Sequence, residues 1–264
     1  MTSPQVKALD ERLRRVEERF HESAEELKDI RRRLLNGTRR EIHEIEDEWQ
    51  GVHYRWWVIT LAGVLGLFIL SYLIYTQLGW YADHRPLPTG SDWLLRRLPP
   101  VNVLPMLSWG WFALHIFAGA AAVLYYPRRM PFLIFMLSVY LLVRTAFVFL
   151  SPIGPPAGML DMRQLDYIFS RLLGTYTFNN EFVFSGHTST PFLFYLFFET
   201  KGLKRVMMAG SLTMAVCVLL SHNHYTVDVL SAYLVSYAVY KLSERLYYGW
   251  VRPLFMTGPS PIPY

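Results

Sequence analysis

The stretch FSGHTSTPFLFYLFFETKGLKRVMMAGSLTMAVCVLLSHNHYTVD, residues 184–228, indicates the fold of the whole chain. It opens with a motif around His187 and closes with a motif around His224 and Asp228. Between the two motifs the chain reads as an apolar hairpin that is long enough to cross a bilayer twice. Two histidines and a carboxylate arranged in this way would meet on one side of a membrane, and we predict a candidate active site there.

The composition of the chain is typical of a polytopic membrane protein. Of its 264 residues, 52% are hydrophobic and 16% are aromatic, and charged residues are dense in the N-terminal part. We predict an all-α fold in which residues 51–250 form a six-transmembrane-helix bundle, preceded by a cytoplasmic helical arm, 1–50, and followed by a Pro-rich, disordered tail, 251–264. The expected spans are residues 57–78, 103–126, 132–150, 185–199, 205–220 and 226–247.

The N-terminal arm carries an amphipathic, heptad-like pattern over residues 5–35, with apolar residues mostly three or four positions apart. This pattern fits either a coiled coil, through which the chain forms a homo-oligomer, or one amphipathic helix lying on lipid headgroups or on the protein itself. After a stop at Gly37, helical spacing resumes with Ile42, Ile45 and Trp49 and leads toward the membrane.

The positions of Lys and Arg predict the orientation in the membrane. With six spans and a cytoplasmic N-terminus, most of these residues lie inside, and the outer loops hold Arg85, Arg96, Arg97, Arg163 and Arg171. Both termini are then cytoplasmic, and His187 and His224 face the exoplasmic side of a plasma or inner membrane. The net charge of +5 follows from this topology, so we expect no nucleic-acid partner.

His187, His224 and Asp228 form the chemical core of the expected site. Asp228 follows His224 by four residues, so a helix would place both side chains on one face, where a carboxylate fixes the imidazole tautomer and makes the ring more basic. His187 follows Ser185 and Gly186 at a helix start, where backbone N–H groups and the helix dipole favour an anion. One histidine could attack a bound phosphate while the other protonates the leaving oxygen.

Arg144 is expected to bind that phosphate. An arginine within an apolar span is costly, and its fork of donors suits phosphate oxygens, although it could also pair structurally with a carboxylate. One arginine suits the single charge of a phosphodiester better than the double charge of a phosphate monoester, which favours a phospholipid substrate.

Other candidate groups have simpler interpretations. His115 is expected to be a core residue of the second span. His222 and His224 indicate a metal site only weakly, because alternate residues rarely point to one ion in a helix, and we expect neither a metal nor a cofactor. Aromatic residues of the outer loops could bind a quaternary ammonium headgroup or anchor the loops at the membrane interface, namely Trp80, Tyr81, Trp93, Tyr167, Phe169, Tyr176 and Phe178.

The two motifs, FSGHT at 184–188 and HNHYTVD at 222–228, resemble the catalytic motifs of the sphingomyelin synthase family, a membrane branch related to the type 2 phosphatidic acid phosphatases. The run RTAFVFLSPIGPP, 144–156, is similar to the third-span segment of that family, and the resemblance extends over about residues 55–247. It implies that His224 forms a phosphohistidine with Asp228 as its partner. It also implies that His187 protonates the departing diacylglycerol oxygen and then takes the proton of an acceptor alcohol, without a metal.

The resemblance leaves donor and acceptor open. Asn179, Asn180 and Glu181 stand where the family has Cys-Gly-Asp, and Asn223 stands where it has Asp. The expected reaction transfers a phosphocholine- or phosphoethanolamine-type headgroup from a phospholipid donor to a lipid alcohol such as ceramide or diacylglycerol. With water as the acceptor, the same site would be a metal-independent lipid phosphatase or phospholipase C. An alternative of another class is a non-catalytic membrane scaffold that acts through its coiled arm.

Overall fold

The computed structural model describes residues 42–50, 52–151, 153–161 and 182–255. Regular structure in these residues is helical, with one isolated bridge between Thr89 and Gly154, so the prediction of an all-α fold is confirmed. The chain divides into two units, Met1–Gly51 and Val52–Tyr264. In the first unit residues 42–50 are helical. The heptad pattern of residues 5–35 lies outside the described residues, and the coiled arm stays a prediction.

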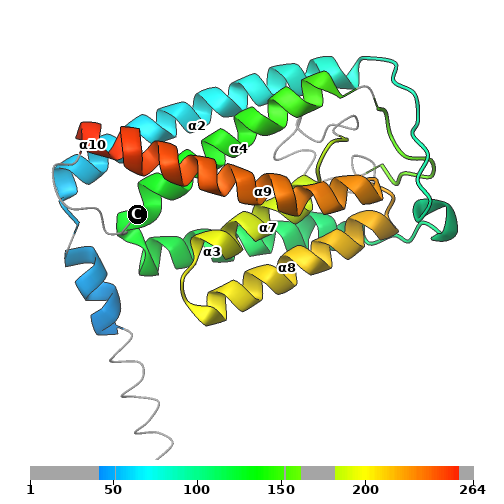
Figure 1. The fold of residues 1–264 in the computed structure, drawn as a ribbon. Coiled ribbons are helices and arrows are strands. Elements are labelled where there is room, and N and C mark those ends of the chain that lie inside the picture. Colours follow the sequence, from blue (N-terminus) through cyan, green and yellow to red (C-terminus); the bar gives the residue numbers. More distant parts are fainter. Residues whose placement is uncertain (1–41, 51, 152, 162–181, 256–264) are drawn as a thin grey trace, which may run out of the picture. The chain divides into compact units, whose positions relative to one another are not determined.

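The described helices of the second unit pack together as a bundle (Figure 1). Its long elements are α2 (Tyr54–Asp83), α3 (Trp111–Tyr125), α4 (Met130–Leu150), α7 (Gly186–Phe197), α8 (Lys201–Leu220) and α9 (Thr226–Leu246). Its short elements are η1 (Leu95–Arg97), η2 (Met106–Gly110), η3 (Pro127–Arg129), η4 (Tyr247–Val251) and α10 (Arg252–Phe255).

Four helical segments of the described chain are long and apolar enough to cross a membrane. They are Tyr54–Asp83, Met106–Tyr125, Pro127–Leu150 and Lys201–Leu220, which correspond to the first, second, third and fifth expected spans. The fourth expected span, 185–199, is the 12-residue helix α7, which is only about 18 Å long. The sixth corresponds to α9, whose 21 residues include Asp228, Lys241 and Glu244. Six spans therefore stay a prediction.

Two expected boundaries differ from the structure. Helix α2 has 30 residues and continues to Asp83, so Trp80 and Tyr81 belong to a helix and not to the following loop. Residues 251–255 are helical, so a tail that begins at residue 251 is wrong for these positions. Residues 256–264 lie outside the described residues.

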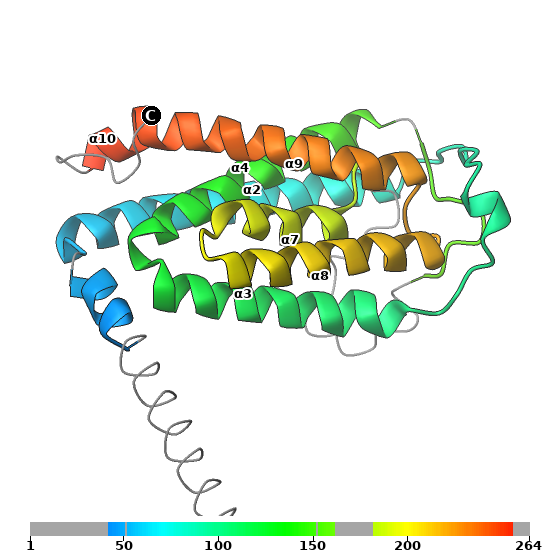
Figure 2. The ribbon, with the colours of Figure 1, turned by 60° about the horizontal axis from the view of Figure 1, so that its bottom comes forward.

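Packing of the bundle brings the ends of several helices together. Helix α2 lies along α4, and the short α7 packs against α8, α9 and α3. Aromatic side chains fill the core around α7, among them Phe132, Phe197, Phe198 and Tyr240. The starts of α7 and α9 and the ends of α2, α4 and α8 lie at one end of the bundle, on the right in Figures 1 and 2. The two histidine motifs therefore reach the same end.

A polar contact ties the opposite end of the bundle. Arg129 forms an ion pair with Glu199, and its guanidinium carbon lies 4.9 Å from the centre of the Phe197 ring. This pair joins the start of α4 to the turn between α7 and α8. Glu199 is thus a structural residue at the end remote from the histidine motifs.

Candidate active site

His224 and Asp228 form a buried pair at the start of α9. The Nδ1 atom of His224 lies 3.2 Å from Oδ2 of Asp228, and the side chains expose only 8% and 4% of their surface. His224 precedes the helix by two residues, and Asp228 lies in its first turn, so the expected four-residue spacing brings the groups together although His224 is not itself helical. Because Nδ1 faces the Asp228 carboxylate, the other ring nitrogen, Nε2, points away from it.

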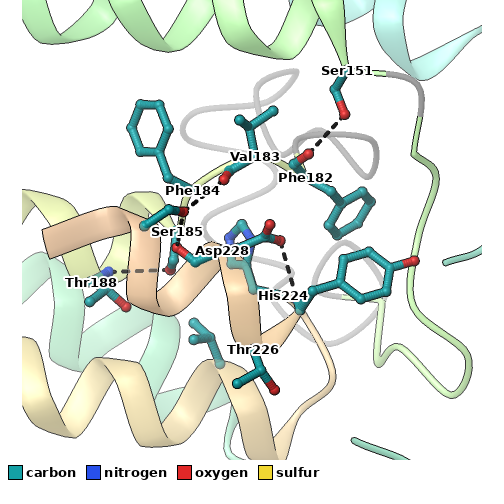
Figure 3. A network of polar contacts seen from close by, with 12 residues as sticks. Ser151, Phe182, Val183, Phe184, Ser185, Thr188, His224, Thr226 and Asp228 are labelled. Carbon is teal, nitrogen blue, oxygen red and sulfur yellow. Dashed lines mark hydrogen bonds and ion pairs between the residues drawn. The ribbon is translucent and has the colours of Figure 1, made fainter. Parts of the chain in front are cut away.

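The two motifs are joined by backbone and side-chain hydrogen bonds. The Ser185 N–H donates to the carbonyl of Asp228 at 3.0 Å, and the Ser231 hydroxyl donates to the carbonyl of Val183, also at 3.0 Å. Ser185 also caps α7, because its hydroxyl oxygen accepts from the Thr188 N–H at 3.3 Å. The start of α7 is therefore docked on the first turn of α9, as Figure 3 shows.

His187 lies in the first turn of α7 and is partly buried. His224, Arg144 and His115 are close enough to act on its ring electrostatically. The ring of Trp111 lies 5.6 Å from that of His187, measured between centroids. His187 and His224 come from different helices, and the hydrogen bond from the Ser185 N–H to the Asp228 carbonyl brings the starts of those helices together.

Arg144 is buried in α4 and faces the turn before α7. Its Nη1 donates to the carbonyl of Phe184 at 2.5 Å, and its guanidinium carbon lies 5.5 Å from the centre of the Phe184 ring. A Cβ atom placed on Gly186 would lie 3.3 Å from the guanidinium carbon, so a glycine at this position lets the cation approach the backbone. The three expected phosphate-binding residues, Arg144, Ser185 and Gly186, are therefore neighbours.

His222 has a role that the sequence did not reveal. Its backbone is left-handed, with φ of 56°, and its Nδ1 and Nε2 atoms lie 2.9 Å from the Ala157 carbonyl and 3.0 Å from the Leu98 carbonyl. Both ring nitrogens face a backbone carbonyl, so the ring ties two loops together. Within the described part of the chain, no group of three His, Cys, Asp or Glu side chains could hold a metal ion.

Tyr225 and Asp92 are further residues of the site that sequence reasoning missed. The Tyr225 hydroxyl accepts from the Gly90 N–H at 2.7 Å and donates to the Gly154 carbonyl at 2.9 Å. Asp92 accepts from the Thr226 N–H at 2.6 Å and from the Thr226 hydroxyl at 3.0 Å. An Asp in a Gly- and Pro-rich loop was visible as a turn former, but no local pattern connects it to Thr226.

Comparisons with known proteins cover this part of the chain. Residues 180–245 match the family model described as PAP2 superfamily C-terminal. Over 71 residues the chain is 35% identical to phosphatidylcholine:ceramide cholinephosphotransferase 2 of Macaca fascicularis. Residues 180–245 are thus similar to the C-terminal part of the PAP2 superfamily, and the chain contains a stretch that is sphingomyelin synthase-like. The match spans 25% of this chain and 20% of the length of that relative, and no solved structure matches.

These comparisons confirm the resemblance inferred from the motifs, and residues 180–245, which match the family model, contain His187, His224 and Asp228. Arg144 and Asp92 lie outside this region and reach its site only through the fold. Together with the four apolar helices, the match shows that the chain is an integral membrane protein.

The remaining candidates make contacts of their own. His115 is partly buried, bonds the Trp111 carbonyl through Nδ1 at 2.7 Å and packs edge-on against Phe194. The aromatic rings that were expected in the outer loops, where the structure describes them, each contact a different neighbour: Trp80 packs on His84, Tyr81 on Phe149 and Trp93 on Arg97. Tyr167, Phe169, Tyr176 and Phe178 lie outside the described residues.

Proposed function

We propose that this protein is a membrane enzyme that cleaves a phospholipid headgroup through a phosphohistidine and transfers the phosphoryl headgroup to a lipid alcohol. The observation that carries this proposal is the His224–Asp228 bond, which occupies Nδ1 and leaves Nε2 as the nucleophile, beside His187 and Arg144. The relative that is 35% identical over 71 residues is named as a phosphatidylcholine:ceramide cholinephosphotransferase, which supports a phosphocholine-type donor and ceramide or diacylglycerol as acceptor.

In the first proposed step, Nε2 of His224 attacks the phosphorus of the donor lipid. The bond from phosphorus to the diacylglycerol oxygen breaks, and that oxygen takes a proton from His187, so diacylglycerol leaves and a phosphohistidine carrying the headgroup remains. Asp228 stabilises the positive charge that the His224 ring acquires, because its carboxylate faces the Nδ1 proton. The negative phosphate favours the protonated form of His187 that this step requires.

In the second proposed step, the acceptor hydroxyl gives its proton to His187 and attacks the phosphorus. The bond between phosphorus and Nε2 breaks, which releases the new phospholipid and restores His224. Arg144, Ser185 and Gly186 are proposed to hold the phosphate oxygens at the start of α7, where the helix dipole favours negative charge. The residues need neither a metal nor a cofactor for these steps.

The proposed setting is a six-span bundle in which α7 and α9 act as the fourth and sixth spans. Both termini would be cytoplasmic, and the site would open to the exoplasmic side of a plasma or inner membrane. Residues 5–35 are proposed to join copies of the chain into a homo-oligomer. The domain division at residues 1–50, 51–250 and 251–264 is part of the same proposal.

The test uses purified protein in mixed micelles with a panel of phosphatidylcholine and phosphatidylethanolamine. Each donor is offered with and without ceramide or diacylglycerol, and the products are resolved by mass spectrometry, with His224→Ala as the inactive control. A new phospholipid that forms only with an acceptor supports the transferase. Diacylglycerol with free phosphocholine or phosphoethanolamine, independent of acceptor, would assign the same site to a phospholipase C that uses water.

Two further outcomes contradict the transferase. Turnover of phosphate monoesters alone would indicate a lipid phosphatase. Biological activity that persists unchanged in both His224→Ala and His187→Ala would favour a scaffold that acts without catalysis.

A further inference from the structure

Asp92 lies in the loop between α2 and α3, and its carboxylate oxygens accept hydrogen bonds at the starts of η1 and α9. Its Oδ1 accepts from the backbone N–H groups of Leu94 and Leu95, at 2.9 and 3.1 Å, and so caps the turn that contains η1. Its Oδ2 accepts from the backbone N–H of Thr226 at 2.6 Å, and its Oδ1 also accepts from the Thr226 hydroxyl. The loop between α2 and α3 thus reaches across 134 residues of sequence to the first residue of α9.

The start of α9 needs an acceptor from elsewhere. The first N–H groups of any α-helix have no partner within the helix, and a Ser, Thr, Asp or Asn before the helix usually supplies one. Here Tyr225 precedes the helix, and its hydroxyl is turned to Gly90 and Gly154. The Asp228 carboxylate accepts from the Tyr225 N–H at 3.1 Å, and Asp92 accepts from the Thr226 N–H.

One oxygen of Asp228, Oδ2, accepts from both partners, so a third donor drawn to this oxygen would compete with them. Its Oδ2 lies 3.1 Å from the Tyr225 nitrogen and 3.2 Å from Nδ1 of His224. Without Asp92, the Thr226 N–H would have no acceptor. It lies one residue after the Tyr225 N–H that Asp228 already satisfies, at the positive end of the helix dipole. An unsatisfied buried donor draws the nearest carboxylate, which here is the group that orients His224.

We propose that Asp92 is a positioning residue: it satisfies the first N–H group of α9 and thereby leaves the Asp228 carboxylate to His224. This inference rests on the proposed function of the site. Asp92 stays ionised in this role, because the hydrogen bonds from Thr226, Leu95 and Leu94 outweigh the effect of burial and hold its pKa below the usual value. The same loop is also fixed by the bond from the Gly90 N–H to Tyr225.

The decisive variant is Asp92→Asn. An Asn at this position has nearly the same shape and can still accept from Leu94 and Leu95 through one oxygen, but its NH2 group would face the Thr226 N–H as a second donor. We expect kcat to fall about tenfold, as when a group that orients a catalytic partner is lost, and KM to change less than about twofold. Asp83→Asn, which removes a carboxylate at the end of α2, is the matched control.

Thr226→Pro tests the mechanism directly. Proline is favoured at the first position of a helix and has no N–H group, so this variant removes the donor that Asp92 satisfies and preserves the helix. Tyr225 already has the extended backbone that a following proline requires. We expect Asp92→Asn to lower kcat in the parent but to have no further effect in the Thr226→Pro background.

A measurement that does not depend on turnover accompanies the kinetics. Amide hydrogen exchange in the peptide that contains Thr226 should be faster in Asp92→Asn than in the parent, because the Thr226 N–H has lost its acceptor. Unchanged exchange would overturn the contact itself. Faster exchange with an unchanged kcat would overturn the positioning role and leave Asp92 as a purely structural cap.

The remaining outcomes separate this inference from the proposed function. If the parent turns over phospholipid but Asp92→Asn still lowers kcat in the Thr226→Pro background, the inference about Asp92 is overturned and the proposed function stands. A change in the pH profile of kcat in Asp92→Asn, absent in Asp83→Asn, would support it, because a structural cap does not alter the ionisation of the His224–Asp228 pair. A parent without turnover on any phospholipid would overturn the proposed function and the inference with it.

Discussion

The Asp228 carboxylate serves two neighbours at the start of α9. It orients the ring of His224 through Nδ1 and caps the helix through the Tyr225 N–H. At the scale of single residues, the site is therefore a set of groups whose positions depend on one carboxylate.

Asp228→Asn should lower kcat about a hundredfold or more, because a neutral amide neither fixes the reactive tautomer of His224 nor stabilises the charged ring. The variant keeps the size of the side chain, so the fold should persist. Steady-state turnover of the donor lipid measures the effect, with thermal unfolding as the check on the fold. A rate within about threefold of the parent would contradict the proposed role of the pair.

Arg144→Lys should also be a poor enzyme. The guanidinium donates to the Phe184 carbonyl and lies against Gly186, and a lysine cannot keep that bond while presenting a fork of donors to a phosphate. We expect a loss of about tenfold or more in kcat/KM for the donor lipid. Arg128→Lys, at the opposite end of α4, is the matched control and should retain the parent value.

Several of these residues could be predicted from the sequence and others could not. His187, His224 and Asp228 belong to short motifs whose chemistry depends on local spacing, and Arg144 was conspicuous as a charge within an apolar run. Asp92 contacts a residue 134 positions away, and His222 bonds carbonyls of two separate loops. Contacts of this kind depend on how irregular loops fold, and no periodicity in the sequence reports them.

At the scale of elements, side chains from the loop after α2 cap the C-terminal end of α4 and the N-terminal end of α9. Arg85 donates through Nη1 to the Phe149 carbonyl at 3.1 Å and through Nη2 to the carbonyls of Val148 and Ser151, at 3.3 and 3.4 Å. A cation at the end of a helix satisfies free carbonyls and complements the helix dipole. One loop thus supplies a positive cap to one helix and a negative cap to another.

Arg85→Ala should destabilise the protein by about 1 kcal/mol, because the last carbonyls of α4 lose a charged donor. The apparent Tm in detergent should fall, whereas Arg96→Ala, an exposed arginine of the same loop, should leave it near the parent value. An equal Tm for the parent and Arg85→Ala would contradict the capping role.

The Asp92 cap predicts a specific pH dependence. Its pKa is lower in the folded protein than the usual value of 3.8, so its stabilising effect is complete above that value and is lost as the pH falls through the lower, folded pKa. The difference in Tm between the parent and Asp92→Asn should therefore be constant at neutral and mildly acidic pH and shrink only below about 4. A difference in Tm that already disappears near pH 6 would contradict the capping role of Asp92.

Helix α7 differs from its predicted length, and it packs against other helices of the bundle. Helix α7 was expected to span residues 185–199 but ends at Phe197, and the chain turns there because Phe198 is extended. Its residues Leu193, Phe194 and Phe197 are buried against neighbouring helices. An apolar run of this length fits either a short membrane span or a helix buried in protein. Composition alone does not distinguish the two, because it does not show what surrounds the helix.

At the scale of the whole molecule, the orientation in the membrane can be tested with single cysteines. The chain's one cysteine, Cys217, is buried, so a Cys217→Ser background is suitable. Ser91→Cys lies in the loop at the site end, and Gly202→Cys lies at the start of α8, where an added Cβ meets no other atom. In intact cells, a membrane-impermeant maleimide should label Ser91→Cys and not Gly202→Cys.

The reverse labelling pattern would place the site in the cytoplasm and contradict the proposed orientation. Labelling of Gly202→Cys only after the membrane is permeabilised is the control that its thiol is reactive. The six-span arrangement requires the two positions to lie on opposite sides, because three of its spans, α3, α4 and α7, separate them along the chain.

The meeting of the α7 and α9 starts at one end of the bundle also bears on how lipids are distributed across a bilayer. An enzyme built in this way draws donor and acceptor from a single leaflet and returns both products to it. Each turnover then alters the headgroup composition of that leaflet alone, so that the activity would generate lipid asymmetry without moving any lipid across the membrane.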